Sequence, residues 1–423
     1  MKKRNLYLGC LLIAVSGAIQ AQSSFTLEQC KELTLKNNYE IRKSELQLKG
    51  AEQSRKEAFT NYFPVVSATG TAMNASAGTM NMEMMGTTLS LMKNGVLGGV
   101  TATQPVFAGG NIVNGNKLAK VGVEAQRYQL DLSEDEILLQ TEQSYYQIVS
   151  LQEKLRTLDQ LEEMLQHLRR DVENSFKAGL ITQNDVLKVK LKQNELASNR
   201  LSVENGLDIT KKLLCQHMGT DPSGFSITYD SLWMESPANL LVNHAEVLSA
   251  RNEYKLLDKN VEANNLQLKI KQGEFLPKVA VGAGYMYHNL TDVNTDFGVV
   301  FATVSIPISA WWGGSHAIKK QKINQQVAMN DRQNKSEQLL IQMQQALNDM
   351  EESYKQVKLA EEAVAEATEN LRLNEDYYKA GTVTLTDLLD AQSFLQQTRD
   401  RYTESITVSR FKRSNYLQVT GRY

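Results

Sequence analysis

Proline is scarce in this sequence, with six residues in 423, and none of them interrupts the longest stretches of the chain. A proline inside a helix removes a backbone hydrogen bond and clashes with the preceding turn, so these stretches are free to form long helices. Two pairs of prolines bound two short segments, and the remaining pair lies near the middle of the chain. In that order, they are Pro64 and Pro105, Pro277 and Pro307, and Pro222 and Pro237.

Cysteine, long apolar runs and concentrated positive charge are also lacking. Three cysteines in a chain of this length make no disulfide framework. Cys30 and Cys215 are either two small buried side chains or a single pair. After the N-terminal segment, no apolar run approaches the about 20 residues that a membrane-spanning helix needs. The net charge of −2, without a basic cluster, argues against nucleic acid as a partner.

The N-terminus has the features of a secretory signal peptide. Met1–Arg4 carries positive charge and is followed by an apolar run through Ile19. We expect cleavage after Ala21, so that residues 1–21 form the signal peptide. Cys10 lies within the apolar run rather than at its end, which argues against attachment of a lipid at this cysteine.

The rest of the chain contains one structural unit twice. The segment Phe176–Leu180 (FKAGL) returns 202 residues later as Tyr378–Thr382 (YKAGT), and the same offset relates Asp185 to Asp387. A shared offset between separated markers indicates a duplicated half-molecule. We therefore expect a first repeat at residues 22–218, a connecting segment at 219–237 and a second repeat at 238–423.

Each repeat has the pattern of a helix, a hairpin, a long helix, a sharp turn and a final helix. The first repeat opens at a capping box formed by Thr26 and Gln29, and the opening helix of the second runs from about Ala238 towards Phe275. The hairpin, long helix and final helix are expected at 64–108, 110–178 and 182–218 in the first repeat, and at 277–309, 313–379 and 384–418 in the second.

The long helices carry a heptad pattern of apolar residues, which is typical of coiled coils. After Gly381, for example, Leu388, Leu395 and Tyr402 recur every seven residues. The stretch 110–178 would form one helix about 100 Å long. That length suits a structure that crosses a compartment better than it suits a globular core.

The two hairpin segments are rich in glycine, threonine, serine and valine and poor in charge. Stretches of about 10 residues within them fit transmembrane β-strands, and an ordinary soluble hairpin fits equally well. If the strands enter a membrane, the four strands of one chain cannot close a barrel alone, because open sheet edges are not viable in lipid. Two chains would supply eight strands and three would supply twelve.

Four short motifs occur in order at matching offsets. Gln104–Gly110 (QPVFAGG) lies at a strand-to-helix junction, and Phe176–Gly179 (FKAG) precedes Asp185. Tyr378–Gly381 (YKAG) marks the second turn, and Thr386–Ala391 (TDLLDA) follows it. Together these motifs make the sequence similar to the TolC-type outer-membrane efflux channels, over essentially the whole mature chain.

This resemblance implies a mainly α fold in which long coiled-coil helices form a periplasmic α-barrel. Four strands per protomer would complete a twelve-stranded transmembrane β-barrel in a homotrimer. The implied location is the outer membrane, with an extension into the periplasm. The implied function is the exit duct of a tripartite efflux or type I secretion system.

The resemblance also implies partners. These are a periplasmic adaptor (membrane fusion) protein, an inner-membrane transporter that supplies the energy, and outer-membrane lipid. The sequence indicates no catalytic residue, no cofactor and no metal site. It also has no phosphate-binding loop with which the chain could use a nucleotide itself.

The family closes its periplasmic entrance with aspartates that match Asp387 and Asp390, which share a helix face. In a trimer they would form two stacked carboxylate rings that attract cations. The alternative is that they only complement the helix dipole. The family's polar links between tip helices match Asp185 and Tyr378, whereas its arginine link is missing, because Val383 occupies that position.

Three further features have expected positions. Gly179 and Gly381 would permit the left-handed backbone of a helix end, on the turns where an adaptor would dock. Trp311 and Trp312 follow the last strand, either in the aromatic belt at the membrane interface or buried in the helix junction. The first hairpin is 11 residues longer than the second, around Met80–Met85, which is either a loop tip or a soft-metal site.

Other function classes fit less well. The five histidines are scattered without metal-ligand spacing, and no nucleophile motif occurs, which argues against an enzyme. The alternative function is that of a periplasmic coiled-coil structural or adaptor protein without a membrane barrel. Two full copies, each with its own pair of strands, argue against this alternative.

Overall fold

The computed structural model describes residues 24–74, 80–84, 87–92, 94–229, 234, 236–291 and 293–423. The predicted signal peptide and Cys10 lie outside these residues. The chain divides into two compact units, each containing parts of both repeats, so the units do not follow the duplication. Unit 1 comprises Met1–Asn38, Gln140–Met234 and Gln356–Phe411, and unit 2 comprises Tyr39–Leu139, Glu235–Lys355 and Lys412–Tyr423.

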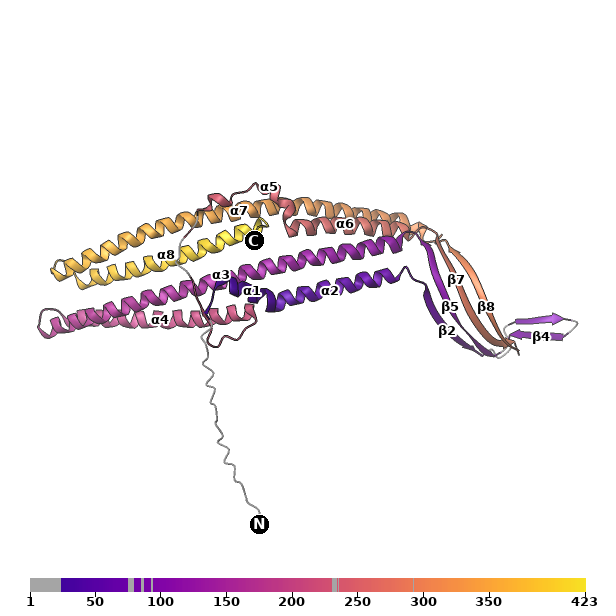
Figure 1. Cartoon of the computed structure of the whole chain (residues 1–423), viewed down its shortest axis with the longest axis horizontal. Helices are drawn as coiled ribbons and strands as arrows, with labels where there is room; N and C mark the ends of the chain where they lie inside the picture. The colour runs from indigo at the N-terminus through magenta and orange to yellow at the C-terminus, as the bar shows by residue number, and fades with distance from the viewer. Residues whose placement is uncertain are drawn as a thin grey trace, which may run out of the picture. The chain divides into compact units, whose positions relative to one another are not determined.

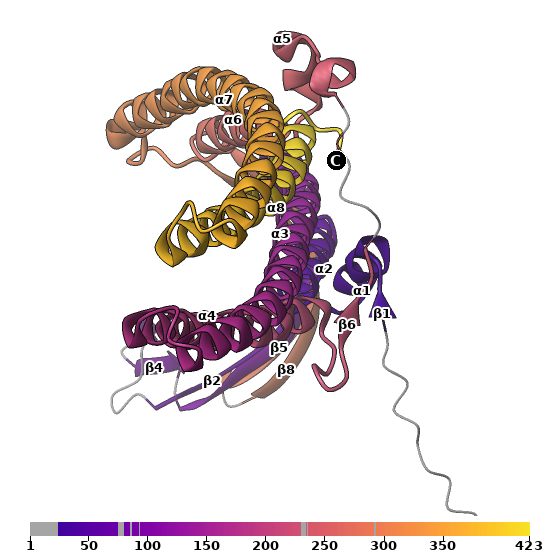
Figure 2. The ribbon, with the colours of Figure 1, turned by 90° about the vertical axis from the view of Figure 1, so that its left-hand side faces the viewer.

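Two helical hairpins make up most of unit 1 (Figure 1). The first joins the part of α3 (Asn111–Lys177) that starts at Gln140 to α4 (Gln183–Met218). The second joins the part of α7 (Trp311–Lys379) that starts at Gln356 to α8 (Leu385–Val419), of which unit 1 holds the residues up to Phe411. Viewed towards their turns, the hairpins are two distinct pairs of coiled helices (Figure 2).

Apolar residues at heptad spacing join the two hairpins in one buried cluster. Leu165 and Val189 of the first hairpin are 0% exposed, and Leu388 of the second is 3% exposed. Full burial of such a side chain contributes about 1.5–3 kcal/mol to folding. The heptad pattern after Gly381 is confirmed at Leu388 and Leu395, which both lie in this cluster.

A second buried cluster of unit 1 surrounds the cysteines. Strand β1 (Ser24–Phe25) pairs in parallel with β6 (Ser226–Ile227), and α1 (Leu27–Asn37) begins at the predicted capping box of Thr26 and Gln29, which is confirmed. Cys30 and Cys215 are free and buried. They share the cluster with Tyr145 and Met218, so both behave as small apolar side chains.

The longer helical segments of unit 2 are α2 (Tyr39–Thr60), α3 up to Leu139, α6 (Asn252–Gly273) and α7 up to Lys355, and the end of α8 from Lys412 also belongs to this unit. Ion pairs connect them; for example, Lys259 Nζ lies 2.6 Å from Glu124 Oε2. None of the described helices is both long and apolar enough to span a membrane.

The prediction of one continuous helix from Ala238 is wrong. The structure instead has a 3₁₀ turn at Pro237–Leu240, α5 at His244–Val247 and a second 3₁₀ turn at Leu248–Ala250 before α6 begins. The side chains of Ser236 and Asn243 each accept a backbone N–H and so start a new short segment. The periodic apolar pattern of the sequence does not indicate these caps, because each depends on a single side chain.

The two predicted hairpins form a single antiparallel sheet in unit 2, in the order β2-β5-β7-β8. The pairing of β5 with β7 joins a strand of the first repeat to a strand of the second. One sheet therefore contains both halves of the duplication. Its strands are β2 (Val65–Met73), β5 (Gly95–Ala108), β7 (Lys278–Thr291) and β8 (Val293–Ser305).

The surplus residues of the first hairpin form strands as well. β3 (Met80–Met84) pairs with β4 (Thr87–Met92) in a separate two-stranded sheet. The interpretation of Met80–Met85 as a loop tip is therefore wrong for Met80–Met84. Met85 and the side chains of all these methionines lie outside the described residues, so the soft-metal alternative stays a prediction.

The pairing register gives the four-stranded sheet two different faces. Val100 lies opposite Ala68 of β2 and Tyr285 of β7, and side chains alternate between faces along each strand. We call this side the apolar face; six of its side chains are between 45% and 86% exposed, namely Val66, Val96, Val100, Tyr285, Val300 and Val304. The other side is the threonine-rich face, which carries Ser67, Thr69, Thr71, Thr101, Thr103, Thr295 and Thr303.

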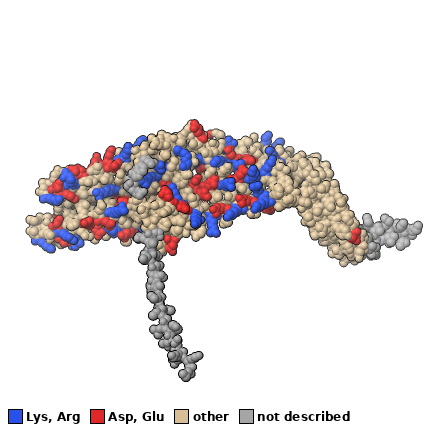
Figure 3. All heavy atoms as spheres, viewed as in Figure 1, with Lys and Arg blue, Asp and Glu red and all other residues tan. Residues whose placement is uncertain are grey.

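Charge is nearly absent from this sheet. Among its described residues, only Lys278 and Asp296 are charged, and Figure 3 shows the sheet almost bare of charged side chains while the helices carry both signs. Such an exposed, uncharged valine and tyrosine surface is unusual for a protein in water.

Cys30 should resist alkylation in the folded protein. The side chain is 0% exposed, and burial raises the pKa of its thiol to about 12, which suppresses the reactive thiolate. We expect iodoacetamide at pH 8 to label Cys30 about 100-fold more slowly in the native protein than in guanidinium chloride. Peptide mass spectrometry over time measures both rates, and equal rates would show that the cluster is open.

Candidate functional site

The candidate site is formed by the turns of the two hairpins in unit 1. Gly179 and Gly381 both have φ of 74°, in the left-handed region. In each turn, the residue after the glycine donates its N–H to the carbonyl five residues earlier, at 2.9 Å in the first turn and 3.0 Å in the second. This is the Schellman arrangement, which ends the helix and reverses the chain.

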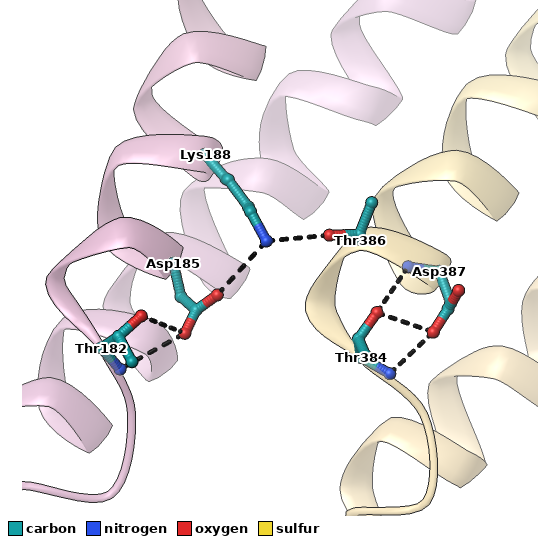
Figure 4. Close-up of polar contacts among 6 residues, drawn as sticks. All are labelled: Thr182, Asp185, Lys188, Thr384, Thr386 and Asp387. Atoms are coloured by element: carbon teal, nitrogen blue, oxygen red, sulfur yellow. Dashed lines mark hydrogen bonds and ion pairs between the residues drawn. The ribbon is translucent and has the colours of Figure 1, made fainter.

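Each helix after a turn begins with a threonine and aspartate capping box (Figure 4). Asp387 Oδ2 accepts hydrogen bonds from the N–H and the hydroxyl of Thr384, at 2.8 and 2.7 Å. Asp185 Oδ2 accepts the equivalent bonds from Thr182, at 3.3 and 2.9 Å. The bonds from Thr384 lower the pKa of Asp387, because they stabilise the carboxylate. Asp387 therefore helps to start α8.

One turn further along, the two repeats differ in charge. The 202-residue offset places Asp390 where the first repeat has Lys188. Lys188 Nζ lies 3.6 Å from Asp185 Oδ1 and donates a hydrogen bond of 2.9 Å to Thr386 Oγ1, which joins the first hairpin to the second (Figure 4). Asp387 and Asp390 are exposed and have no basic partner in the described part of the chain.

Lys188 is a residue of this site to which no local sequence pattern assigns a role. Its partner Thr386 is almost 200 residues away in the sequence, so no local pattern reveals the bond. The repeat offset is the available signal, since it exposes the exchange of a lysine for Asp390.

The predicted link residues Asp185 and Tyr378 line one cavity of about 930 Å³ between the two turns, together with Lys188 and Gly381. No hydrogen bond joins Asp185 to Tyr378 among the residues that the structure describes. The two groups are nevertheless neighbours: burial first, and then the charge of Asp185, raises the pKa of the half-buried Tyr378 hydroxyl.

The predicted interface tryptophans belong to unit 2, where they begin α7. Trp311 Nε1 donates a 2.9 Å hydrogen bond to the carbonyl of Phe275 and is 48% exposed. Trp312 is 83% exposed. Burial in the helix junction, one of the two alternatives, is therefore wrong for Trp312.

Comparison with known proteins identifies the class of molecule that has this architecture. A model of the outer membrane efflux proteins matches residues 31–220 and 241–405 of the chain. The chain belongs to this family. No curated protein sequence matches it.

Crystal structures of outer membrane proteins, two of them channels, share the fold. The CmeC channel of Campylobacter jejuni is 15% identical, with a TM-score of 0.82 over 100% of this chain and 93% of its own. VceC of Vibrio cholerae is 17% identical, with a TM-score of 0.77 over 93% of this chain and 96% of its own. The MtrE channel of Neisseria gonorrhoeae, crystallised in its open state, is 14% identical, with a TM-score of 0.76 over 93% and 88%.

The protein is thus an outer membrane efflux protein with the fold of known outer membrane channels. Its family and fold are those of channel proteins rather than of enzymes. The predicted family and the mainly helical fold with a small β part are confirmed.

Substitutions of Gly381 should show that backbone strain, and not steric crowding, opposes a side chain at this position. A Cβ at this position would meet no atom within 4 Å, so only the positive φ opposes a side chain. We expect Gly381→Val to lower the stability by about 1–2 kcal/mol and Gly381→Asn to lower it less, because asparagine tolerates this conformation.

Thermal unfolding followed by circular dichroism measures the difference. Gly50→Val is the control, since Gly50 lies in α2 with an equally open surrounding and no positive φ. A Gly381→Val protein as stable as the asparagine variant would contradict a requirement for glycine at this turn.

Proposed function

We propose that three copies of this chain form the exit duct of a tripartite efflux or type I secretion system, and that the four-stranded sheets of the three copies close into one twelve-stranded barrel in the outer membrane. The observation that carries this proposal is the sheet itself, whose two outer strands each have one edge without a partner among the described residues, and whose two faces differ.

The unpaired edges of the two outer strands require other copies of the chain as partners. Within the described residues, β2 pairs only with β5 and β8 pairs only with β7. Unpaired backbone groups cannot remain in lipid, so β8 of one copy must meet β2 of the next. The apolar face then contacts lipid, and the threonine-rich face lines the water-filled channel, as in membrane barrels generally.

Two neighbouring residues test the assignment of the faces. Val100 lies on the apolar face and is 52% exposed, whereas Thr101 lies on the opposite face. We expect Val100→Lys to destabilise the membrane form by about 2–4 kcal/mol and to deplete it from outer membranes. The Thr101→Lys protein should insert into the outer membrane normally. Light scattering in detergent should give it the mass of three chains. Equal tolerance of both lysines, or a stable monomer, would refute the barrel.

The entrance of the duct is proposed to lie at the hairpin turns. Three copies would bring together six carboxylates from Asp387 and Asp390, in two rings. The first repeat contributes no comparable charge, because Lys188 neutralises Asp185. The rings therefore arise from the second repeat alone and would attract cations. The Lys188–Thr386 hydrogen bond, with Asp185 and Tyr378 beside it, would hold the two hairpins of a copy together when the entrance is closed.

Conductance in planar bilayers tests the entrance. We expect the double variant Asp387→Ala/Asp390→Ala to be blocked by a trivalent cation about tenfold less tightly than the native channel, because the carboxylates that bind it are gone. Asp208→Ala is the control, since Asp208 is an exposed acid of α4 paired with Lys212. Unchanged block in the double variant would remove Asp387 and Asp390 from the entrance.

The remaining partners follow from the same arrangement. A periplasmic adaptor would dock on the turns at Gly179 and Gly381, and an inner-membrane transporter would supply the energy. Trp311 and Trp312 would lie at the interface of the outer membrane, where indole rings are favoured. The open state of the MtrE channel supports the view that this duct also alternates between closed and open entrances.

A further inference from the structure

The helices of unit 2 carry an excess of positive charge where they meet the four-stranded sheet. Residues 55–63, 111–123, 269–277 and 311–323 contain nine basic residues against two acidic ones, whereas the whole chain has 46 against 48. All four segments belong to unit 2, and Figure 3 shows basic side chains on the helices next to the nearly uncharged sheet. A local excess of one sign in an almost neutral chain points to an anionic partner at this level.

The two helices that begin at the sheet hold most of this excess. Their segments, at the start of α3 and of α7, contain no acidic residue. The 202-residue offset relates Lys117 and Lys120 of α3 to Lys319 and Lys322 of α7, and Lys320 adds a fifth lysine. We call these five residues the basic collar; all of them are exposed. Both repeats thus present the same pair of lysines on the helix that follows their last strand.

The charges of the basic collar are not balanced within the chain. Lys120 is the one member with an ion pair among the described residues, and its Nζ lies 3.8 Å from Glu124 Oε1. The same carboxylate lies closer to Lys259, at 2.6 Å. Like charges about one turn apart on a helix repel each other. An external anion between the lysines would relieve this repulsion.

The basic collar also lies beside the surface that the proposed barrel turns towards lipid. Trp312, at the start of α7, is 83% exposed, and Lys319 follows seven residues later on the same helix face, to within about 20°. The rise between Trp311 and Lys319 is about 12 Å. Long side chains of a helix lean towards its N-terminus, which is here the end next to the sheet. The ammonium groups of α7 therefore extend towards the layer of lipid headgroups, where indole rings are also favoured.

We propose that the basic collar binds the phosphate groups of anionic phospholipids, such as phosphatidylglycerol, in the periplasmic leaflet of the outer membrane. This inference rests on the proposed membrane barrel, because only a sheet in the membrane places headgroups at this level. The acyl chains lie beside Trp312 and the apolar face, and the lysines contact the phosphates. Each lysine near an anionic membrane surface strengthens binding about fivefold. The collar thereby helps to fix the depth of the barrel in the membrane.

Three probes separate headgroup charge from acyl chains. Dioleoylphosphatidylglycerol and dioleoylphosphatidylcholine share their chains and differ in net charge, and glycerophosphoglycerol is the anionic headgroup without chains. Native mass spectrometry of the full-length protein in detergent gives the affinity for each. We expect phosphatidylglycerol to bind about tenfold more tightly than phosphatidylcholine, and glycerophosphoglycerol not to bind measurably.

Variants of α7 assign the binding to the basic collar. Lys319→Gln/Lys322→Gln should lower the affinity for phosphatidylglycerol about tenfold and leave that for phosphatidylcholine within about twofold. Lys319→Arg/Lys322→Arg keeps the charges and should bind as the native protein does, which separates lost charge from a change in fold. Lys335→Gln/Lys355→Gln is the control, since both lysines are exposed further along the same helix, and its affinity should not change.

The outcomes that overturn the inference are distinct from those that overturn the channel. Equal affinity of the native protein for the two lipids, or an equal loss in the control variant, would refute the collar. Tight binding of glycerophosphoglycerol would assign the lysines to a free phosphodiester. A changed anion permeability of the glutamine variant with unaltered lipid binding would place them in the lumen. A conducting trimer keeps the channel in all these cases, whereas a stable monomer refutes the barrel whatever lipid it binds.

Discussion

The backbone groups along the outer edges of β2 and β8 impose the constraint on which the rest of the molecule depends. A strand edge in water can be solvated, but an edge in hydrocarbon has to be paired. In the proposed barrel the face with Val100 and Val300 contacts lipid, so water cannot be the partner of these edges there. The pairing therefore has to come from other copies of the chain. The proposed assembly, its lumen and the carboxylate rings at its entrance all follow from this pairing.

Duplication supplied the parts, and divergence gave them separate roles. Both turns keep a left-handed glycine and a threonine and aspartate cap, which are the features needed to reverse a helical hairpin. One turn later, Lys188 in the first repeat and Asp390 in the second differ in sign. The first hairpin bonds to its neighbour through Lys188, and the second carries the exposed carboxylates of Asp387 and Asp390.

Features encoded over short distances were predictable from the sequence. The capping box at Thr26 follows from a four-residue motif, the heptad core around Leu388 from apolar residues every seven positions, and the four strands from segments rich in glycine, threonine, serine and valine. The break after Ala238 and the pairing of β3 with β4 were missed, because single side-chain caps and short methionine-rich strands leave no period. The Lys188–Thr386 bond depends on which distant segments meet, and no sequence pattern encodes that directly.

The pairing of β5 with β7 has a consequence for the integrity of the chain. In unit 2 this pairing binds the first repeat to the second along most of a strand, and in unit 1 the shared leucine cluster binds the two hairpins. The peptide link through residues 219–237 is therefore redundant as a tether. A protease that cut the backbone there would leave two fragments that the sheet of unit 2 and the leucine cluster of unit 1 still hold together.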